Sequence, residues 1–393
     1  MVSERLQAVT PSVTLAINSR VQELEAEGKD VVKFGVGEPD YPTPEHIKDA
    51  AREAIAKNKT KYTPAAGIPQ LRKAISDKFA EDNNLQYEPS QVMVSVGAKQ
   101  SIYNSLMALV NPGDEVIVVA PYWVSYPEQV KLASGTPVIA QTTEETNFKL
   151  TPDILRNTIS DRTKALILNS PNNPTGTVYT EDELAELGKV LDEHGIWAIC
   201  DEVYESLVYD DAEHISLAAA YPEMYSRSVV INGVSKSYAM TGWRIGYAAG
   251  PKEIISAMSS VQGHSTSNAT SISQWAALAA LKGPKGEIEQ MVEDYGKRRN
   301  YMTERLQNTP GFNFEKPQGA FYLFPNVSEL IGRTIKGTEV TDIDVLAKLL
   351  LEEAHVALVP GSGFGAPENL RFSYSAAPAR IEEGMDRLEE MLS

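Results

Sequence analysis

Residues 165–201 read ALILNSPNNPTGTVYTEDELAELGKVLDEHGIWAICD and contain two short apolar runs separated by a helical pattern. The runs Ala165–Asn169 and Trp197–Cys200 have the length of buried strands. Between them, Glu181–His194 has leucines on one face and charges on the other, and Gly195 follows as a helix stop. The inward side chains are Leu184, Leu187 and Leu191, and the outward ones are Asp182, Glu186, Lys189 and Glu193. This order predicts a βαβ unit with parallel strands.

The same alternation of strand and helix extends along the chain on both sides of this unit. Further candidate strands are Val92–Val96, Glu115–Val119, Val138–Gln141, Val229–Asn232 and Ile245–Ala248. Strands that alternate with helices predict an α/β fold, in which helices flank a mainly parallel sheet that is buried on both faces. We therefore expect a mainly parallel, seven-stranded sheet.

The pattern changes after about Gly286, where a long helical segment begins. After it come the apolar run Gly319–Phe324, a helix over Ile343–Glu353, a strand over Val356–Val359 and an amphipathic helix that ends at Leu392. This part predicts a second, smaller α+β domain. We expect a large domain over residues 46–299 and a small domain built from residues 1–45 and 300–393.

The charge balance and hydropathy of the chain disfavour several classes of partner. The 393 residues carry 36 basic and 53 acidic side chains, a net charge of −17. This balance argues against nucleic acid and anionic membranes, both of which favour a basic face. The N-terminal residues lack the apolar stretch of a signal peptide, and no run approaches a membrane span. We expect a cytoplasmic protein.

Several kinds of catalytic chemistry are absent from the sequence. The single cysteine, Cys200, rules out an intrachain disulfide and a thiolate metal cluster, and it ends an apolar run as a core residue would. The five histidines have no metal-ligand spacing, so we expect no metal. The stretch Gly361–Gly365 is rich in glycine but lacks the spacing of a dinucleotide fingerprint, and we interpret it as a flexible loop.

Reactive side chains follow three of the candidate strands. Asn173 lies in the segment after one strand, Asp201 and Tyr204 follow the next, and Ser235-Lys236 follows a third. Ligands of parallel α/β sheets bind beyond the carboxyl ends of the strands. The sequence therefore predicts that an amide, an acid, a phenol and an amine converge on one crevice.

These residues resemble those of the class I and II aminotransferases, pyridoxal-phosphate (PLP) enzymes of fold type I. The resemblance runs from Gly35–Asp40 to Arg371–Tyr374, and its most specific part is Ser235–Gly246, SKSYAMTGWRIG. Within the family the chain looks most like the bacterial aspartate aminotransferases of the prokaryotic subgroup, which share Gly97–Lys99 and Pro121–Tyr126.

The resemblance implies a set of residues that bind the PLP ring. Lys236 bonds covalently to the cofactor and, once freed, carries the proton between substrate and cofactor. Asp201 faces the pyridine nitrogen and keeps it protonated. Tyr204 and Asn173 donate hydrogen bonds to the phenolic oxygen, and Trp123 stacks on the ring.

The resemblance also implies a phosphate site. Arg244 fits a forked contact to phosphate. The start of a helix over Gln100–Val110 presents backbone N–H groups to an anion. Tyr62 matches a tyrosine that reaches the phosphate from a partner subunit, which implies a homodimer. The remaining residues implied near the phosphate are Gly97, Ala98, Lys99 and Ser235.

The substrate residues follow from the same resemblance. Arg371 matches the arginine that binds the α-carboxylate, and Gly37 lies in the loop that closes over it. Lys99 is implicated in binding the distal carboxylate, and it stands at a helix start, where the dipole disfavours a cation without an anionic ligand. Ser12 and Thr14 are candidates to share that carboxylate. Trp123 and Asn173 complete the implied substrate site.

The activity implied is transfer of the amino group of L-aspartate to 2-oxoglutarate, giving oxaloacetate and L-glutamate by ping-pong kinetics. Alternatives are an aminotransferase for aromatic amino acids, alanine or prephenate, a β-lyase, and a non-enzymatic PLP-sensing regulator. Members that accept prephenate carry a basic residue where this chain has Thr10, which disfavours prephenate. The acidic composition disfavours a DNA-binding regulator.

Overall fold

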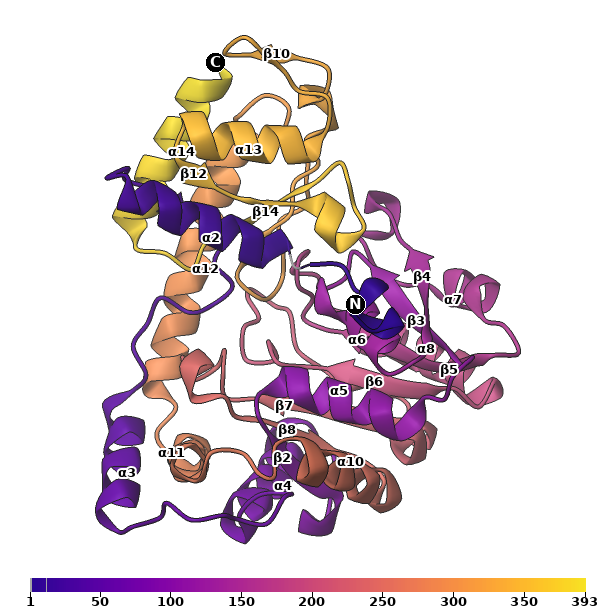
Figure 1. Cartoon of the computed structure of the whole chain (residues 1–393). Helices are drawn as coiled ribbons and strands as arrows, with labels where there is room; N and C mark the ends of the chain where they lie inside the picture. Colours follow the sequence, from indigo (N-terminus) through magenta and orange to yellow (C-terminus); the bar gives the residue numbers. More distant parts are fainter. Residues whose placement is uncertain (1, 12) are drawn as a thin grey trace.

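The computed structural model describes residues 2–11 and 13–393. Figure 1 shows a large α/β region at the bottom and right, and a smaller region at the top. The long helix α12 (Gly286–Gln307) runs from one region to the other. Among the described residues, the structure contains no helix with the length and apolar character of a membrane span.

A seven-stranded sheet forms the centre of the large region, with the strand order β2-β8-β7-β6-β5-β3-β4. Strand β8 is antiparallel to both of its neighbours, and the other pairs are parallel. The mainly parallel sheet of the prediction is therefore confirmed. The bounds are β2 (Val92–Ser95), β3 (Glu115–Ala120), β4 (Thr136–Gln141), β5 (Thr163–Asn169), β6 (Trp197–Asp201), β7 (Ser228–Gly233) and β8 (Gly246–Ala249).

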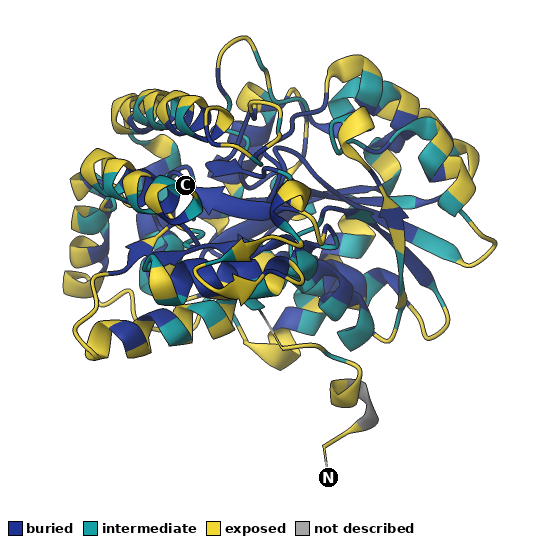
Figure 2. Ribbon diagram, turned by 90° about the horizontal axis from the view of Figure 1, so that it is seen from above, coloured by how far each residue is buried: buried dark blue, intermediate teal, exposed yellow. Residues whose placement is uncertain are grey.

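Both faces of this sheet are buried by helices (Figure 2). Successive side chains of a strand point to opposite faces, so Val116 and Val118 pack in one core while Ile117 packs in another. Cys200 is buried in the second of these cores, as predicted. The helices of the large region are α3 (Glu45–Ala56), α4 (Pro69–Asp82), α5 (Ala98–Leu109), α6 (Ser125–Leu132), α7 (Pro152–Thr158), α8 (Glu181–Glu193), α9 (Leu217–Ala220), α10 (Lys252–Ser265) and α11 (Ser271–Lys282).

Helix α8 shows how local sequence signals set the ends of an element. Thr180 accepts a hydrogen bond from the Glu183 N–H, and the Glu183 carboxylate accepts from the Thr180 N–H, which forms a capping box. At the other end, Gly195 has a φ of +65°, a conformation that glycine adopts without a steric cost. The helix predicted from leucine spacing therefore begins and ends where these residues place it.

The smaller region contains two small sheets. One is antiparallel with the order β13-β14-β9, and the other pairs β1 with β12 in parallel. The β1–β12 pair joins the N-terminal segment to the C-terminal one. The elements are β1 (Val32–Lys33), β9 (Tyr322–Leu323), β12 (Val356–Ala357), β13 (Val359–Pro360), β14 (Leu370–Ser373), a hairpin of β10 (Thr334–Ile335) and β11 (Thr338–Glu339), and the helices α1 (Glu4–Gln7), α2 (Val13–Ala26), α13 (Ile343–Glu353) and α14 (Pro378–Leu392).

One predicted strand is wrong in this region. Residues 356–359 form two short strands, β12 and β13, that belong to different sheets because the chain crosses from one sheet to the other at Leu358. Periodicity cannot show such a crossing, since all of these side chains are buried. Helix α12 continues through the predicted boundary at residues 299 and 300, so the division into 46–299 and 1–45 with 300–393 stays a prediction.

Candidate active site

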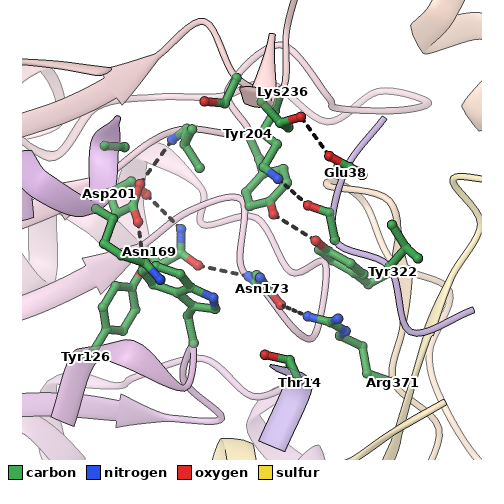
Figure 3. A pocket seen from close by; sticks show the side chains of 18 of the residues that line it. Thr14, Glu38, Tyr126, Asn169, Asn173, Asp201, Tyr204, Lys236, Tyr322 and Arg371 are labelled. Atoms are coloured by element: carbon green, nitrogen blue, oxygen red, sulfur yellow. Dashed lines mark hydrogen bonds between the residues drawn. The ribbon is translucent and has the colours of Figure 1, made fainter. Parts of the chain in front are cut away.

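A cavity of about 400 Å³ lies at the carboxyl ends of β5, β6 and β7 (Figure 3). Residues from the smaller region, on α2, the segment after β1, β9 and β14, form part of its wall. The predicted crevice at the strand ends is therefore present. The predicted site residues that line it are Thr14, Gly37, Ala98, Lys99, Trp123, Asn173, Asp201, Tyr204, Ser235, Lys236, Arg244 and Arg371.

Lys236 projects into the cavity from the loop that follows β7 (Figure 3). Its Nζ donates a hydrogen bond to the Gly37 carbonyl oxygen and lies 5.7 Å from the centre of the Tyr204 ring. Burial lowers the pKa of Lys236 to about 8, and the nearby Glu38 carboxylate opposes that shift. A substantial fraction of the amine is therefore neutral near pH 8, as a nucleophile or base requires.

Asp201 is the last residue of β6 and is 4% exposed. Its carboxylate accepts a hydrogen bond of 2.7 Å from the Tyr126 hydroxyl and one of 3.3 Å from the Val203 N–H. Burial raises the pKa of Asp201 to about 6, and both hydrogen bonds oppose the shift. Ionisation of this carboxylate is therefore unfavourable in the buried site, and a cationic partner in the cavity would stabilise the ionised form.

We expect Asp201→Asn to stabilise the cofactor-free protein at pH 8. The pKa is 3.8 when unfolded and about 6 when folded. The free energy of unfolding therefore falls as the pH rises from the lower to the higher of these pKa values. Above the higher value, the ionised carboxylate lowers the free energy of unfolding by on the order of 3 kcal/mol. Urea unfolding at pH 5 and pH 8 measures the effect, which should be larger at pH 8. Equal stability of wild-type and Asp201→Asn at pH 8 would contradict a destabilising charge at Asp201. Asp182→Asn, on the exposed face of α8, is the control.

Arg371 lies on β14 as a buried cation, 2% exposed. One nitrogen donates to the Asn173 side-chain oxygen at 2.9 Å and another to the Gly35 carbonyl at 2.9 Å. Among residues 2–11 and 13–393, Arg371 forms no ion pair, and its Nε has no hydrogen-bond partner. A buried guanidinium without a counter-ion is costly, so this group is suited to an anionic ligand that enters the cavity.

The start of α5 forms a second anion site. Gly97, the N-cap residue, has a φ of +82°, and a Cβ built there would lie 2.4 Å from an Arg244 guanidinium nitrogen. The first N–H groups of a helix have no acceptor within the helix, so those of Ala98 and Lys99 can bind an anion. Gly97 does not line the cavity itself, but it lets Arg244 approach these groups.

Lys99 lies next to this anion site, with its Nζ 4.6 Å from the centre of the Trp123 ring. Desolvation lowers the pKa of Lys99, and the Arg244 charge adds to the effect. A lysine whose charged form is disfavoured by burial and by a neighbouring guanidinium again favours an anion beside it. The Trp123 ring stands edge-on to Tyr126 at 5.4 Å, which fixes its orientation at the cavity wall.

Besides Gly97, one predicted site residue in the described part of the chain lies outside the cavity wall. Tyr62 is 89% exposed and absent from the cavity wall. Ser12 lies outside the described residues, whereas Thr14, near the start of α2, does line the cavity.

Comparison with known proteins identifies the family. Residues 29–388 match the model of the family described as aminotransferase class I and II. The chain belongs to this family. It is 52% identical over 390 residues to aspartate aminotransferase of Geobacillus stearothermophilus (99% of this chain, 98% of that protein) and 48% identical over 389 residues to aspartate/prephenate aminotransferase of Cereibacter sphaeroides (98% and 97%).

Solved structures of similar proteins support the same family assignment. Aspartate aminotransferase from Rhizobium meliloti superposes with a TM-score of 0.96 at 40% identity, and both chains are covered completely. The Thermus thermophilus aspartate aminotransferase with maleate superposes with a TM-score of 0.94 at 42% identity, also over both complete chains. The chain is therefore an aminotransferase of fold type I.

Aminotransferases of class I and II depend on PLP, and the cavity residues fit that cofactor. The α5 start with Arg244 suits the phosphate, because it combines free N–H groups with a guanidinium. Asp201 suits the pyridine nitrogen, since its buried carboxylate requires a positive partner. Lys236, with its lowered pKa, suits the covalent bond to the aldehyde.

The structure places further residues of this aminotransferase in the cavity that the sequence did not single out. Some lie in runs already noted, such as Glu38 beside Gly37, Tyr126 three residues after Trp123, and Asn169 at a strand end. Tyr322 lies in an apolar run, and only its hydroxyl could have drawn attention. The full set of added lining residues is Asn18, Gly35, Val36, Glu38, Tyr126, Asn169, Val203, Thr241 and Tyr322.

Proposed function

We propose that this enzyme transfers the amino group of L-aspartate to 2-oxoglutarate, giving oxaloacetate and L-glutamate. The observation that carries the proposal is that two cations, Arg371 and Lys99, line the same cavity as Lys236. A dicarboxylic substrate has two carboxylates to place, and each cation can bind one of them. Several similar proteins are named aspartate aminotransferase, and the Thermus thermophilus structure contains maleate, a dicarboxylate.

Each residue contributes a distinct part of the chemistry. PLP, when bound, supplies an electron sink for the electron pair left by removal of the substrate Cα proton. The Lys236 amine takes that proton and returns it, since burial holds its pKa near 8. Arg371 binds the α-carboxylate and fixes the substrate orientation. Asp201 would hold the proton of the pyridine nitrogen, and Tyr204 and Asn173 would bind the phenolic oxygen.

Closure of the N-terminal segment over the substrate belongs to the same proposal. Gly37 accepts from Lys236, and the Thr241 hydroxyl donates to the Glu38 carboxylate at 2.7 Å, so this segment contacts the large region across the cavity. Such a contact can exclude water when substrate is bound. An unchanged X-ray scattering profile on addition of a dicarboxylate inhibitor would argue against closure.

A single half-reaction tests the substrate assignment. Aspartate alone should convert the absorption spectrum of the PLP-loaded enzyme, and 2-oxoglutarate should restore it, as ping-pong chemistry requires. Alanine and an aromatic amino acid are the alternative donors, and prephenate, an oxo acid, is the alternative to 2-oxoglutarate as acceptor. A cofactor that responds to one of these donors but not to aspartate would overturn the aspartate assignment and keep the family.

We expect Lys99→Ala to lower kcat/KM for aspartate by roughly 10- to 100-fold, the effect of one charge-assisted contact. The kcat/KM for alanine should stay within about twofold of the wild-type value, because alanine has no distal carboxylate. Lys189→Ala, on the exposed face of α8, is the matched control. Equal losses for aspartate and alanine would assign Lys99 to the cofactor alone and leave the distal carboxylate to other groups such as Thr14.

We also propose a cytoplasmic homodimer in which Tyr62 reaches the phosphate site of the partner subunit. Support comes from the 89% exposure of Tyr62, which is large for an aromatic side chain, and from the resemblance that pairs this position with a partner site. The single buried cysteine is compatible with a reducing compartment. Sedimentation equilibrium should give twice the chain mass, and a monomer with full activity would reject the shared site.

A further inference from the structure

Tyr322 stands between two residues of the candidate active site (Figure 3). Its hydroxyl lies 2.8 Å from the Tyr204 hydroxyl, and its ring lies 4.5 Å from the Arg371 guanidinium carbon. The residue is fully buried on β9, and its backbone pairs with Ser373 on β14, the strand that carries Arg371. One side chain therefore contacts both a cofactor-facing phenol and a substrate-facing cation.

We infer that Tyr322 is a positioning residue that orients the Tyr204 hydroxyl and the Arg371 guanidinium, and thereby couples binding of the substrate carboxylate to the cofactor. This inference rests on the proposed function, because it uses the roles assigned there to Tyr204 and Arg371. Tyr322 itself is assigned no contact with substrate or cofactor.

The direction of the hydrogen bond between the Tyr204 and Tyr322 phenols depends on what else Tyr204 donates to. Either hydroxyl can donate in this pair, and each has a single proton. When Tyr204 donates to the phenolic oxygen of the cofactor, only Tyr322 can supply the proton between the two tyrosines. A hydroxyl that accepts one hydrogen bond becomes a stronger donor in the next. Tyr322 therefore strengthens the bond that Tyr204 makes.

The Arg371 guanidinium lies close to two aromatic rings. Its central carbon lies 4.5 Å from the centre of the Tyr322 ring and 5.1 Å from the centre of the Phe364 ring, and a cation is attracted to the face of an aromatic ring. The stacking fixes the guanidinium plane, while Asn173 and Gly35 accept two of its hydrogens. A fixed plane favours a forked contact with a carboxylate, because less freedom is lost on binding.

There is little space between Tyr322 and the loop that contains Gly37. A Cβ built on Gly37 would lie 3.2 Å from the Tyr322 hydroxyl and 4.0 Å from an Arg371 nitrogen. The loop that contacts Lys236 therefore packs directly against Tyr322. Burial raises the pKa of Tyr322, and the Arg371 charge opposes the shift. Two charged groups also act on the pKa of the Tyr204 phenol: Arg371 lowers it and Asp201 raises it.

The test compares Tyr322→Phe, which keeps the ring and removes the hydroxyl, with Tyr322→Leu, which removes both. In the PLP-loaded protein, Tyr322→Phe should move the pH titration of the cofactor absorbance upward by about half to one unit. The reason is that a weaker Tyr204 donor leaves the phenolic oxygen more basic. Its KM for aspartate should rise less than about threefold, whereas Tyr322→Leu should raise KM roughly two- to thirtyfold by loss of the cation–π contact.

A control and a double-mutant cycle separate positioning from general damage to the core. Tyr374 is equally buried in the same core and donates to the Ala320 carbonyl, so Tyr374→Phe should leave the titration unchanged. Tyr204→Phe combined with Tyr322→Phe should titrate like Tyr204→Phe alone, because the Tyr322 hydroxyl acts through Tyr204.

Three results would overturn the inference: a titration in Tyr322→Phe that matches wild-type, equal shifts in Tyr322→Phe and Tyr374→Phe, or additive shifts in the double variant, which would refute action through Tyr204. The failure of the proposed function is separate, since wild-type enzyme would then fail to respond to aspartate. A wild-type enzyme that responds, together with an unshifted Tyr322→Phe, rejects only the role of Tyr322.

Discussion

Replacing Lys236 with alanine should abolish amino transfer, with a fall in kcat/KM of more than about 10⁴-fold, because nucleophile and proton carrier are lost together. No other amine on the cavity wall can take over, since Lys99, the second lysine among the described lining residues, lies against Trp123 at the α5 start. The measurement is kcat/KM for aspartate and 2-oxoglutarate under PLP saturation.

The loss should not come from unfolding. In wild-type protein the Lys236 amine is desolvated and donates a hydrogen bond to the Gly37 carbonyl oxygen. Its removal loses that hydrogen bond but also removes a charge that burial disfavours. We expect the thermal unfolding midpoint of the cofactor-free variant to stay within a few degrees of wild-type. Lys189→Ala serves as the control for loss of a lysine. A Lys236→Ala enzyme that retains a tenth of wild-type activity would refute the assignment.

A low pKa of the free amine is the physical basis of this role, and it can be measured without any turnover. The rate at which an amine-directed reagent modifies Lys236 in cofactor-free protein should titrate near the value of about 8 given by its burial. A modification rate at Lys236 that does not change between pH 7 and pH 9 would contradict this basis for its role.

The strands were predictable because each one is a continuous apolar run. Parallel strands buried on both faces need no alternation, so the run Ala165–Asn169 marks β5 to within a few residues. The convergence of Asn173, Asp201 and Lys236 also followed from the sequence, since ligands meet the carboxyl ends of such strands. The seven-stranded sheet and the residues at its ends were therefore within reach of sequence reasoning.

Contacts between distant segments were not predictable. Tyr322 lies 118 residues from Tyr204, and nothing in the run around it separates a core tyrosine from a cavity residue. The amide of Asn169 likewise donates to the Asp201 carbonyl oxygen, a contact that exists only once β5 and β6 pair. Such partners depend on sheet register and on the smaller region, neither of which local pattern specifies.

Arg371→Gln should lower kcat/KM roughly 30- to 5,000-fold, the range for loss of a buried charge that pairs with its ligand. The loss should be similar for aspartate, glutamate and alanine, because all three carry the α-carboxylate. This pattern differs from that of Lys99→Ala, which should spare alanine. Arg371→Lys keeps the charge but loses the fork, so we expect an intermediate loss.

The same substitution should not destabilise the cofactor-free protein. Burial lowers the pKa of Arg371, its Nε has no partner in the described part of the chain, and its acceptors are the neutral groups of Asn173 and Gly35. A charge held in this way costs folding free energy, so Arg371→Gln should unfold at the same or a higher urea concentration than wild-type. Loss of activity together with a gain of stability would show that Arg371 is a binding group. The free-energy cost of burying its unpaired charge would then be offset by the substrate carboxylate. A parallel loss of stability and activity would instead assign Arg371 to the core.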